Sequence, residues 1–238
     1  MPVSLEALVE RYGLGAIQAG QLEALVQHVT ADPSAPTTVR DRRGILHDHL
    51  ADSLVALELP VVRGATAIAD LGAGAGFPGL PLAIALPSAR VSLVESNGRK
   101  CAFMAHAIEV SGLVNAEAIH ARAEAWADGL GTCDLVTARA LAPLAVVAEY
   151  AAPLLTEGGA LVAWRGRRNP EDEAAGARAA AELGLETEAP VHVAPYPGAL
   201  HRHLHVIVKV APTPRRFPRR PGMARKRPLG AASDRAQR

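Results

Sequence analysis

Apolar residues recur every three or four positions through the first sixty residues, which is the spacing of amphipathic helices. Three series follow one another, from Leu5 to Tyr12, from Ile17 to Val29 and from Ile45 to Leu57. The segment from Ala31 to Pro36 between the second and the third contains two prolines, and it predicts a loop. The N-terminal part of the chain is therefore predicted to be helical.

After Ala65 the pattern changes to short apolar runs that alternate with helical stretches, as in a parallel sheet covered by helices. Seven strands are predicted, at Ala65–Leu71, Arg90–Glu95, Ala116–His120, Asp134–Thr137, Ala160–Trp164, Val191–Val193 and Leu204–Val210. Helices are expected at 79–86, 97–111, 142–155 and 171–183. Polar and apolar residues alternate along the last strand, which indicates an antiparallel strand near a sheet edge. The fold class is therefore α/β.

Composition narrows this picture only slightly. Of the 238 residues, 49% are hydrophobic but only 3% aromatic, and the length suits one main domain. No apolar run approaches the roughly 20 residues of a membrane span, and the N-terminus lacks the order of a signal peptide, so we expect a cytoplasmic protein. Cys101 and Cys133 have no Cys or His at metal-ligand spacing. Both are expected to be reduced and structural, with no bound metal.

Charge is distributed unevenly along the chain. Nine Lys and Arg residues against the single acid Asp234 give residues 211–238 a charge of +8, and 16 basic against 23 acidic residues give residues 1–210 a charge of −7. A dense basic segment on an acidic body suits a phosphate-bearing partner, although a solvated terminus has the same composition. We predict a helical extension over 1–60, a main domain over 61–210 and a basic arm without its own core over 211–238.

Three glycines at two-residue spacing, Gly72, Gly74 and Gly76, follow the first predicted strand. Such a loop allows a tight turn and a close approach of ligand to backbone, as in nucleotide sites. The run from Gly74 to Gly79 also satisfies the dinucleotide pattern G-x-G-x-x-G. Asp70, just before the glycines, would repel a pyrophosphate but tolerates the ammonium and sulfonium cations of S-adenosylmethionine. The loop therefore favours S-adenosylmethionine over a dinucleotide.

Further candidate residues stand where predicted strands end, at the sheet edge where open-sheet ligands bind. Glu95 closes the second strand, nineteen residues after the last of these glycines, where a carboxylate can accept hydrogen bonds from both ribose hydroxyls. Ala123 and Glu124 follow the third strand, and Arg139 follows the fourth. Purely structural roles remain open for two of these residues. Glu95 could be an exposed acid at the end of a strand, and Arg139 could form an ion pair with Asp70 or Glu124 inside the fold.

These segments resemble the bacterial 16S ribosomal RNA guanine-N7 methyltransferase G family (RsmG, also called GidB). The most specific part is the continuation Phe77-Pro-Gly-Leu-Pro81 after the glycines. The resemblance runs from about Arg40 to Leu229. Its further motifs are Leu93–Lys100, Ala138–Ala140, His201–Leu204 and Pro218–Gly222.

The resemblance implies a Rossmann-like class I methyltransferase fold, S-adenosylmethionine as cofactor, and 16S ribosomal RNA or the small ribosomal subunit as partner of a monomeric enzyme. It implies cofactor contacts at Gly72, Phe77, Ala123, Glu124 and Arg139. It also implies substrate-side roles for Arg139, the basic arm and the group His49, Asp52 and Ser53. An alternative for His49 and Asp52 is a simple pair on the surface of a helix, without a role in the site. The candidate RNA contacts are Arg165, Arg202, Arg215, Arg216, Arg219, Arg220, Arg225, Lys226 and Arg227.

Two departures from the family pattern affect these contacts. Pro36-Thr-Thr38 stands before Arg40-Asp41 where family members usually have Asn-Leu-Thr. Arg165-Gly166 replaces a Lys-Gly pair, which keeps the charge but changes the hydrogen-bonding geometry.

The implied reaction needs no general base, because guanine N7 carries a lone pair in the neutral base. Catalysis then consists of placing N7 in line with the sulfonium methyl, about 3–3.5 Å away. Arg139 is the candidate for orienting guanine O6 or a phosphate. Two other classes remain open: an NAD-dependent Rossmann oxidoreductase, and a non-catalytic ribosome-binding protein on the same scaffold.

Overall fold

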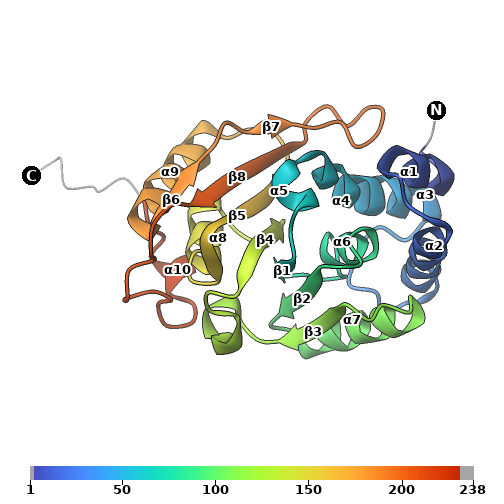
Figure 1. Cartoon of the computed structure of the whole chain (residues 1–238), viewed down its shortest axis with the longest axis horizontal. Coiled ribbons are helices and arrows are strands. Elements are labelled where there is room, and N and C mark those ends of the chain that lie inside the picture. Colours follow the sequence, from blue (N-terminus) through green and yellow to red (C-terminus); the bar gives the residue numbers. More distant parts are fainter. Residues whose placement is uncertain (1–2, 231–238) are drawn as a thin grey trace, which may run out of the picture.

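An eight-stranded, mostly parallel sheet crosses the described part of the chain (Figure 1). The computed structural model describes residues 3–230, so Asp234, Arg235 and Arg238 lie outside the described residues. The strand order is β3-β2-β1-β4-β5-β8-β6, with β7 paired to β8. The strands are β1 (Ala67–Leu71), β2 (Arg90–Glu95), β3 (Ala116–His120), β4 (Cys133–Arg139), β5 (Leu155–Arg165), β6 (Leu185–Thr187), β7 (Val191–His192) and β8 (His203–Lys209).

The sheet differs from the prediction by one strand. Sequence patterning predicts seven, and the structure adds β6, which has only three residues and is too short to show an alternating pattern. Strands β1 to β5 are joined by parallel pairings, and β8 is antiparallel to β5, as predicted from its alternation. Because β6 pairs with β8, the last strand lies one place inside the edge.

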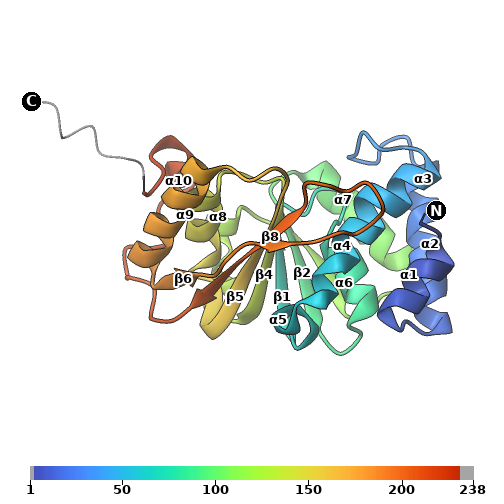
Figure 2. The same ribbon diagram turned by 90° about the horizontal axis from the view of Figure 1, so that it is seen from above.

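Helices cover both faces of the sheet (Figures 1 and 2). Three helices of the main domain begin and end within one residue of the predicted bounds, whereas the helix predicted at 142–155 spans only Leu144–Ala151, because Leu155 already belongs to a strand. Asn97 and Asn169 cap two of the helices through their side-chain oxygens. These helices are α6 (Gly79–Ala85), α7 (Gly98–Val110), α8 (Leu144–Ala151) and α9 (Pro170–Leu183), with short 3-10 turns η3 (Ala123–Ala125) and η4 (Ala127–Gly129).

The N-terminal region is helical as predicted, but its third helix is composite. The first two helices are regular, whereas the third series of apolar residues spans a seven-residue π-helical segment between short α-helical and 3-10 turns. The elements are α1 (Leu5–Tyr12), α2 (Ala16–Ala31), α3 (Arg42–Gly44), η1 (Ile45–Ala51), α4 (Asp52–Leu54), η2 (Val55–Glu58) and α5 (Pro60–Arg63).

Two buried clusters form the core, one on each face of the sheet. Successive residues of β5 point to opposite faces, so Val162 belongs to the first cluster and Leu161 to the second. The first cluster also contains Leu22 and Ile45 of the N-terminal helices, together with Leu80 of α6. The N-terminal helices therefore share a core with the sheet.

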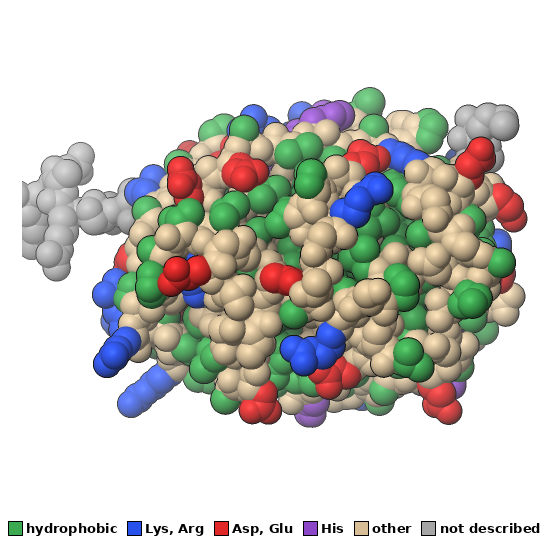
Figure 3. Space-filling view, in the orientation of Figure 1, with side chains coloured by type: hydrophobic (Ala, Val, Ile, Leu, Met, Phe, Trp, Pro, Cys, Tyr) green, Lys and Arg blue, Asp and Glu red, His purple; other side chains and the backbone are tan. Residues whose placement is uncertain are grey.

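The basic segment after Val210 packs against the body through residue 230. Phe217 and Ala224 are buried in the second cluster, and Ala224 belongs to the short helix α10 (Met223–Lys226). In Figure 3 Lys and Arg side chains project from the left end of the molecule, where α10 lies in Figure 1. Between residues 3 and 230, no helix is long and apolar enough to cross a membrane.

Candidate functional site

The π-helical segment η1 brings polar side chains to the carboxyl edge of the sheet. His49 lies in η1, and Asp52 is the first residue after η1; both side chains are buried. The reading of these two as a helical surface pair is therefore wrong. Ser53 is also buried, but its hydroxyl donates to the His49 carbonyl oxygen at 2.6 Å, within the helix itself. Such wide helical turns often occur at functional sites.

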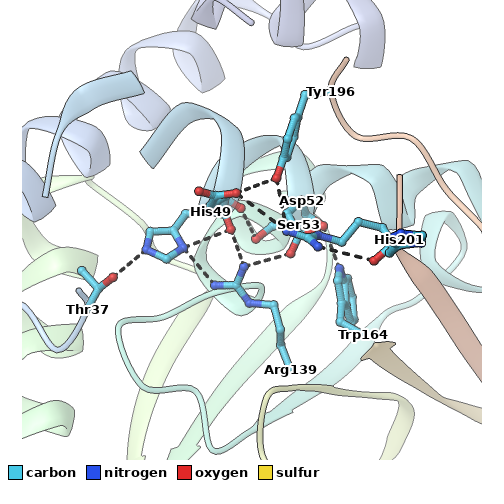
Figure 4. Close-up of polar contacts among 10 residues, drawn as sticks. Thr37, His49, Asp52, Ser53, Arg139, Trp164, Tyr196 and His201 are labelled. Carbon is cyan, nitrogen blue, oxygen red and sulfur yellow. Dashed lines mark hydrogen bonds and ion pairs between the residues drawn. The ribbon is translucent and has the colours of Figure 1, made fainter. Parts of the chain in front are cut away.

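Arg139, the last residue of β4, is held against this helical segment (Figure 4). Its Nη1 donates to the Asp48 carbonyl oxygen at 2.7 Å and to Asp52 Oδ2 at 3.0 Å. Its Nη2 lies 3.1 Å from Nδ1 of His49. Ala140 turns the chain directly after it with φ of 53°, a conformation that few non-glycine residues adopt. The guanidinium is thereby fixed in position from several sides.

Asp52 joins two arginines that are far apart in the sequence. Its second carboxylate oxygen accepts from Nε of Arg202 at 3.2 Å, so one buried carboxylate contacts both Arg139 and Arg202. Among the described residues the ion-pair partner of Arg139 is Asp52 and neither Asp70 nor Glu124, which the sequence offered as alternatives. The Asp48 carboxylate lies 3.8 Å from Arg202, so the cluster contains two arginines and two aspartates.

Two aromatic side chains support the cluster. The Tyr196 hydroxyl donates to the Asp48 carboxylate at 2.6 Å and accepts from Arg202 at 3.2 Å. The indole Nε1 of Trp164, at the end of β5, donates to the Asp52 carbonyl oxygen at 2.7 Å. The cluster is therefore bound to both the sheet and the loop before β8.

His49 is neutral in this environment. Burial, with the neighbouring Arg139 guanidinium, lowers the pKa of His49 from 6.5 to about 4. Nδ1 of His49 lies 3.1 Å from Nη2 of Arg139 and 3.1 Å from the Asp48 carbonyl oxygen, and Nε2 lies 2.8 Å from Thr37 Oγ1. The imidazole also stacks on Phe77, with ring centroids 4.5 Å apart. His49 thus connects the arginine cluster to the glycine loop.

The glycine loop follows β1 as predicted and is shaped by close packing. Gly72 has φ of 65°, and a Cβ there would lie 2.5 Å from Leu141 Cδ1, so a larger residue fits neither the conformation nor the space. Asp70 is fully buried below the loop, where its carboxylate accepts from the Gly79 amide at 2.9 Å and from the Thr137 hydroxyl at 2.8 Å. Burial raises the pKa of Asp70 from 3.8 to about 6.

Asp70 therefore fastens the loop to β4 and to the start of α6. It lines neither of the two cavities described below, so the direct contact with a cationic cofactor that its charge suggests stays a prediction.

Glu95 lies beside the glycine loop, as its spacing predicts. Its Oε2 accepts from the Gly74 amide at 3.3 Å and its Oε1 from the Asn97 amide at 2.9 Å. The side chain is buried, which rules out the reading of an exposed strand-end acid. Glu95 lines neither of the two cavities described below, so its hydrogen bonds to a ribose stay a prediction.

Two cavities meet at Gly72. The larger, a cleft of about 870 Å³, lies between the glycine loop and the arginine cluster, and the smaller, of about 280 Å³, lies beyond the ends of β2 and β3. The cleft is lined by Gly72, Gly74, Phe77, Asp48, His49, Asp52, Arg139, Trp164, Arg165, Arg167 and Arg202, among others. The smaller cavity is lined by Gly72, Val94, Ser96, Ala121, Arg122, Ala123, Glu124, Leu141, Tyr150 and Arg225.

Most of the predicted site residues thus lie at one edge of the sheet. The basic residues predicted to contact RNA lie in several different places. Arg165 lines the cleft while paired with Asp172, whereas Arg225 lines the smaller cavity. In the C-terminal segment, Arg216 pairs with Glu182 and Arg219 with the buried Glu149. Among the predicted RNA contacts, four are exposed outside both cavities and have no ion pair among the described residues: Arg215, Arg220, Lys226 and Arg227.

Sequence reasoning missed Thr37, Asp48, Tyr196 and Trp164 as members of the site. None belongs to a pattern of spacing, and only the Pro-Tyr-Pro-Gly turn at Tyr196 marks a defined loop. Within residues 3–230, no group of three or more His, Cys, Asp or Glu side chains could hold a metal ion.

Comparisons with known proteins agree with this arrangement. The family model described as rRNA small subunit methyltransferase G matches residues 25–203. The chain is 44% identical over 198 residues to Ribosomal RNA small subunit methyltransferase G of Chloroflexus aggregans, covering 81% of this chain and 82% of that protein. It is 41% identical over 197 residues to the protein of the same name from Pelotomaculum thermopropionicum, covering 81% and 82%.

Among solved structures the chain is similar to the S-adenosylmethionine-dependent methyltransferase SibL. The TM-score is 0.57 at 15% identity, over 87% of this chain and 74% of that one. This likeness confirms the Rossmann-like methyltransferase fold expected from the sequence. With the family model matching most of its length, the chain belongs to the rRNA small subunit methyltransferase G family.

Proposed function

We propose that this chain transfers the methyl group of S-adenosylmethionine to N7 of a guanine in 16S ribosomal RNA of the small subunit. The observation that carries the proposal is the single cleft in which the glycine loop faces a fixed arginine–carboxylate cluster, in a chain of this family. One side of the cleft suits the cofactor, and the other suits a base with its phosphates.

The two cavities that meet at Gly72 suit the two ends of the cofactor. In our proposal the adenosine lies in the smaller cavity, beside Ala123 and Glu124, and the Glu95 carboxylate accepts from the ribose hydroxyls. The glycine loop would hold the methionine part, and Phe77 would line the cleft beside it. When bound, S-adenosylmethionine supplies the electrophilic methyl group.

Arg139 orients the target base in this proposal. N7 must keep its lone pair for the attack, so Arg139 binds guanine O6 or a phosphate, and Asp52 and His49 hold the guanidinium in place. The neutral His49 adds no second positive charge beside the purine that becomes cationic as the methyl group arrives. No residue needs to remove a proton.

The N-terminal and C-terminal regions both contribute to RNA binding in the proposal. Residues 1–60 supply the Asp52 carboxylate, the Asp48 carbonyl oxygen and the His49 imidazole that hold Arg139. Arg165 and Arg202 extend the basic lining of the cleft. Outside the cleft, Arg215, Arg220, Lys226 and Arg227 are exposed and suit contacts with phosphates. Arg219 instead anchors its segment to Glu149.

The test compares 16S RNA from cells with and without this gene, digested to nucleosides and fragments for mass spectrometry. We expect one 7-methylguanosine to disappear when the gene is deleted and to return when it is restored. A 7-methylguanosine content that is the same in both strains would overturn the proposal. As a separate test of the cofactor, S-adenosylmethionine but not NADH should raise the melting temperature of the purified protein.

A further inference from the structure

The segment from Phe217 to Arg227, which we call the C-terminal strap, is anchored to the body at one end. The Phe217 ring is buried in the second core cluster, which also contains Val146 and Tyr150 of α8. Arg219 pairs through both nitrogens of its fork with the buried Glu149 of α8, with Nε 2.6 Å from Oε1. Arg219 also donates to the Arg227 carbonyl oxygen at 2.9 Å, which ties the two ends of the strap together.

The inner side of the strap reaches the smaller cavity. The Gly222 amide donates to Oε1 of Glu124 at 2.8 Å, and Nη2 of Arg225 donates to the Leu141 carbonyl oxygen at 3.0 Å. Leu141 in turn packs directly on Gly72 of the glycine loop. Arg225, Leu141 and Glu124 all line the cavity, so the strap forms part of its wall.

The outer side of the strap is exposed and basic. Arg220, Lys226 and Arg227 are exposed, and no ion pair holds them among the described residues. Lys226 and Arg227 directly follow Arg225, so the inner contact and the outer charges lie on consecutive residues of one short segment. A contact with RNA on the outer side therefore lies within two residues of the contact that lines the cavity.

We propose that the C-terminal strap closes the adenosine end of the cofactor site, with Arg225 as a cofactor-binding residue, and that it couples cofactor binding to RNA binding. The proposal rests on the proposed function, because it takes the smaller cavity to be the adenosine site and the exposed basic residues to contact RNA. The Gly222 amide orients Glu124, which leaves the second carboxylate oxygen for the adenine amino group. Arg225 covers the opening beside Tyr150.

Coupling of this kind is reciprocal. If RNA bound to Lys226 and Arg227 favours the closed strap, RNA raises the affinity for the cofactor, and the cofactor raises the affinity for RNA by the same factor. The cofactor contact of the inner side and the RNA contact of the outer side can be tested separately by mutation, because different residues form them.

The first experiment measures binding of S-adenosylhomocysteine by titration calorimetry without RNA. Arg225→Ala is expected to weaken binding about fivefold, the loss of one hydrogen-bonding side chain at the cavity wall. Arg216→Ala is the matched control: Arg216 lies next to the strap and pairs with Glu182, away from the cavity, so its loss should leave this affinity unchanged. Equal affinities of Arg225→Ala and the wild type, with equal melting temperatures, would overturn the assignment of Arg225.

The second experiment repeats the titration with an in vitro transcript of small-subunit ribosomal RNA. We expect the transcript to tighten S-adenosylhomocysteine binding severalfold in the wild type. The double variant Lys226→Gln, Arg227→Gln should keep the affinity measured without RNA and lose this gain. A gain of the same size in the double variant, or no gain in the wild type, would overturn the coupling. A wild type that binds no S-adenosylhomocysteine at all would instead overturn the proposed function.

Discussion

The two sides of the cleft are built in different ways. The side that we propose for the cofactor, here the cofactor side, is the glycine loop with Asp70 and Glu95 behind it. It comes from one stretch of chain, and Glu95 contacts a backbone amide only 21 positions away. On the side that we propose for the substrate, here the substrate side, Asp52 contacts Arg139 at a separation of 87 positions and Arg202 at a separation of 150. A backbone loop with close packing therefore shapes one side, whereas long-range charge pairs between side chains shape the other.

Burial shifts the pKa of one titratable group on each side, and the two shifts have opposite directions. Burial raises the pKa of Asp70 to about 6, above its usual 3.8, and lowers the pKa of His49 to about 4, below its usual 6.5. Each group is stabilised in its uncharged form. Their contributions to stability must therefore change in opposite directions over the same range of pH.

The largest predicted effect is on the pH dependence of the free energy of unfolding. Between pH 4 and 6 folded Asp70 holds a proton that the unfolded chain releases, so the Asp70 contribution falls by about 3 kcal/mol as pH rises through this window. His49 behaves oppositely: the unfolded chain takes up the proton first, so about 3 kcal/mol is lost as pH falls from 6.5 to 4. Urea unfolding at a series of pH values measures both.

The variants Asp70→Asn and His49→Gln isolate these two contributions. The stability of the wild type minus that of Asp70→Asn should fall from pH 4 to 7, and the same difference for His49→Gln should rise. Two differences that are independent of pH would show that neither group is buried in the charge state described.

On the cofactor side, Glu95→Ala should weaken S-adenosylmethionine binding about 100-fold. In the proposed site the variant loses two charge-assisted hydrogen bonds to the ribose, and it also releases the Gly74 amide. Glu117→Ala is the control, because Glu117 lies on the neighbouring strand β3, is exposed and bonds only to Ser92 among the described residues. Calorimetry that gives both variants the same affinity would contradict the place of Glu95 in the site.

The local origin of one side and the long-range contacts of the other also explain which parts of the site could be predicted from the sequence. The glycine loop and Glu95 were predictable because strand spacing alone puts them side by side in a βαβ unit. The α/β class followed from periodicity, while β6 was missed because three residues show no pattern. The link from Asp52 to Arg139 and Arg202 was not predictable, since it depends on how the N-terminal helices and the loop before β8 pack on the sheet.

On the substrate side, Asp52→Asn should lower the turnover number about tenfold and leave the affinity for S-adenosylmethionine within twofold of the wild type. The amide keeps the shape of the carboxylate but loses the charge that holds two arginines. Glu58→Gln removes an exposed ion pair with Arg11, away from the cleft, and should change neither quantity. If Asp52→Asn lost cofactor affinity but kept its turnover number, Asp52 would belong to the cofactor site, and the proposed assignment of the two sides would be wrong.

The smallest effect concerns the RNA contacts outside the cleft. Replacing Arg220, Lys226 and Arg227 together by Gln should weaken binding of a small-subunit RNA transcript and make the slope of log affinity against log salt shallower by about two. Filter binding between low and moderate salt measures this slope. An unchanged slope would remove these three residues from the RNA interface.

The most direct test of the account measures methyl transfer from labelled S-adenosylmethionine to guanine N7 in small ribosomal subunits that lack the modification, for the wild type, Glu95→Ala and Arg139→Ala. At saturating cofactor the account predicts that Glu95→Ala regains most of the wild-type rate, whereas Arg139→Ala stays about 100-fold slower because the target base is no longer oriented. Full recovery of Arg139→Ala at saturating cofactor, or label on an atom other than guanine N7 in the wild type, would contradict it.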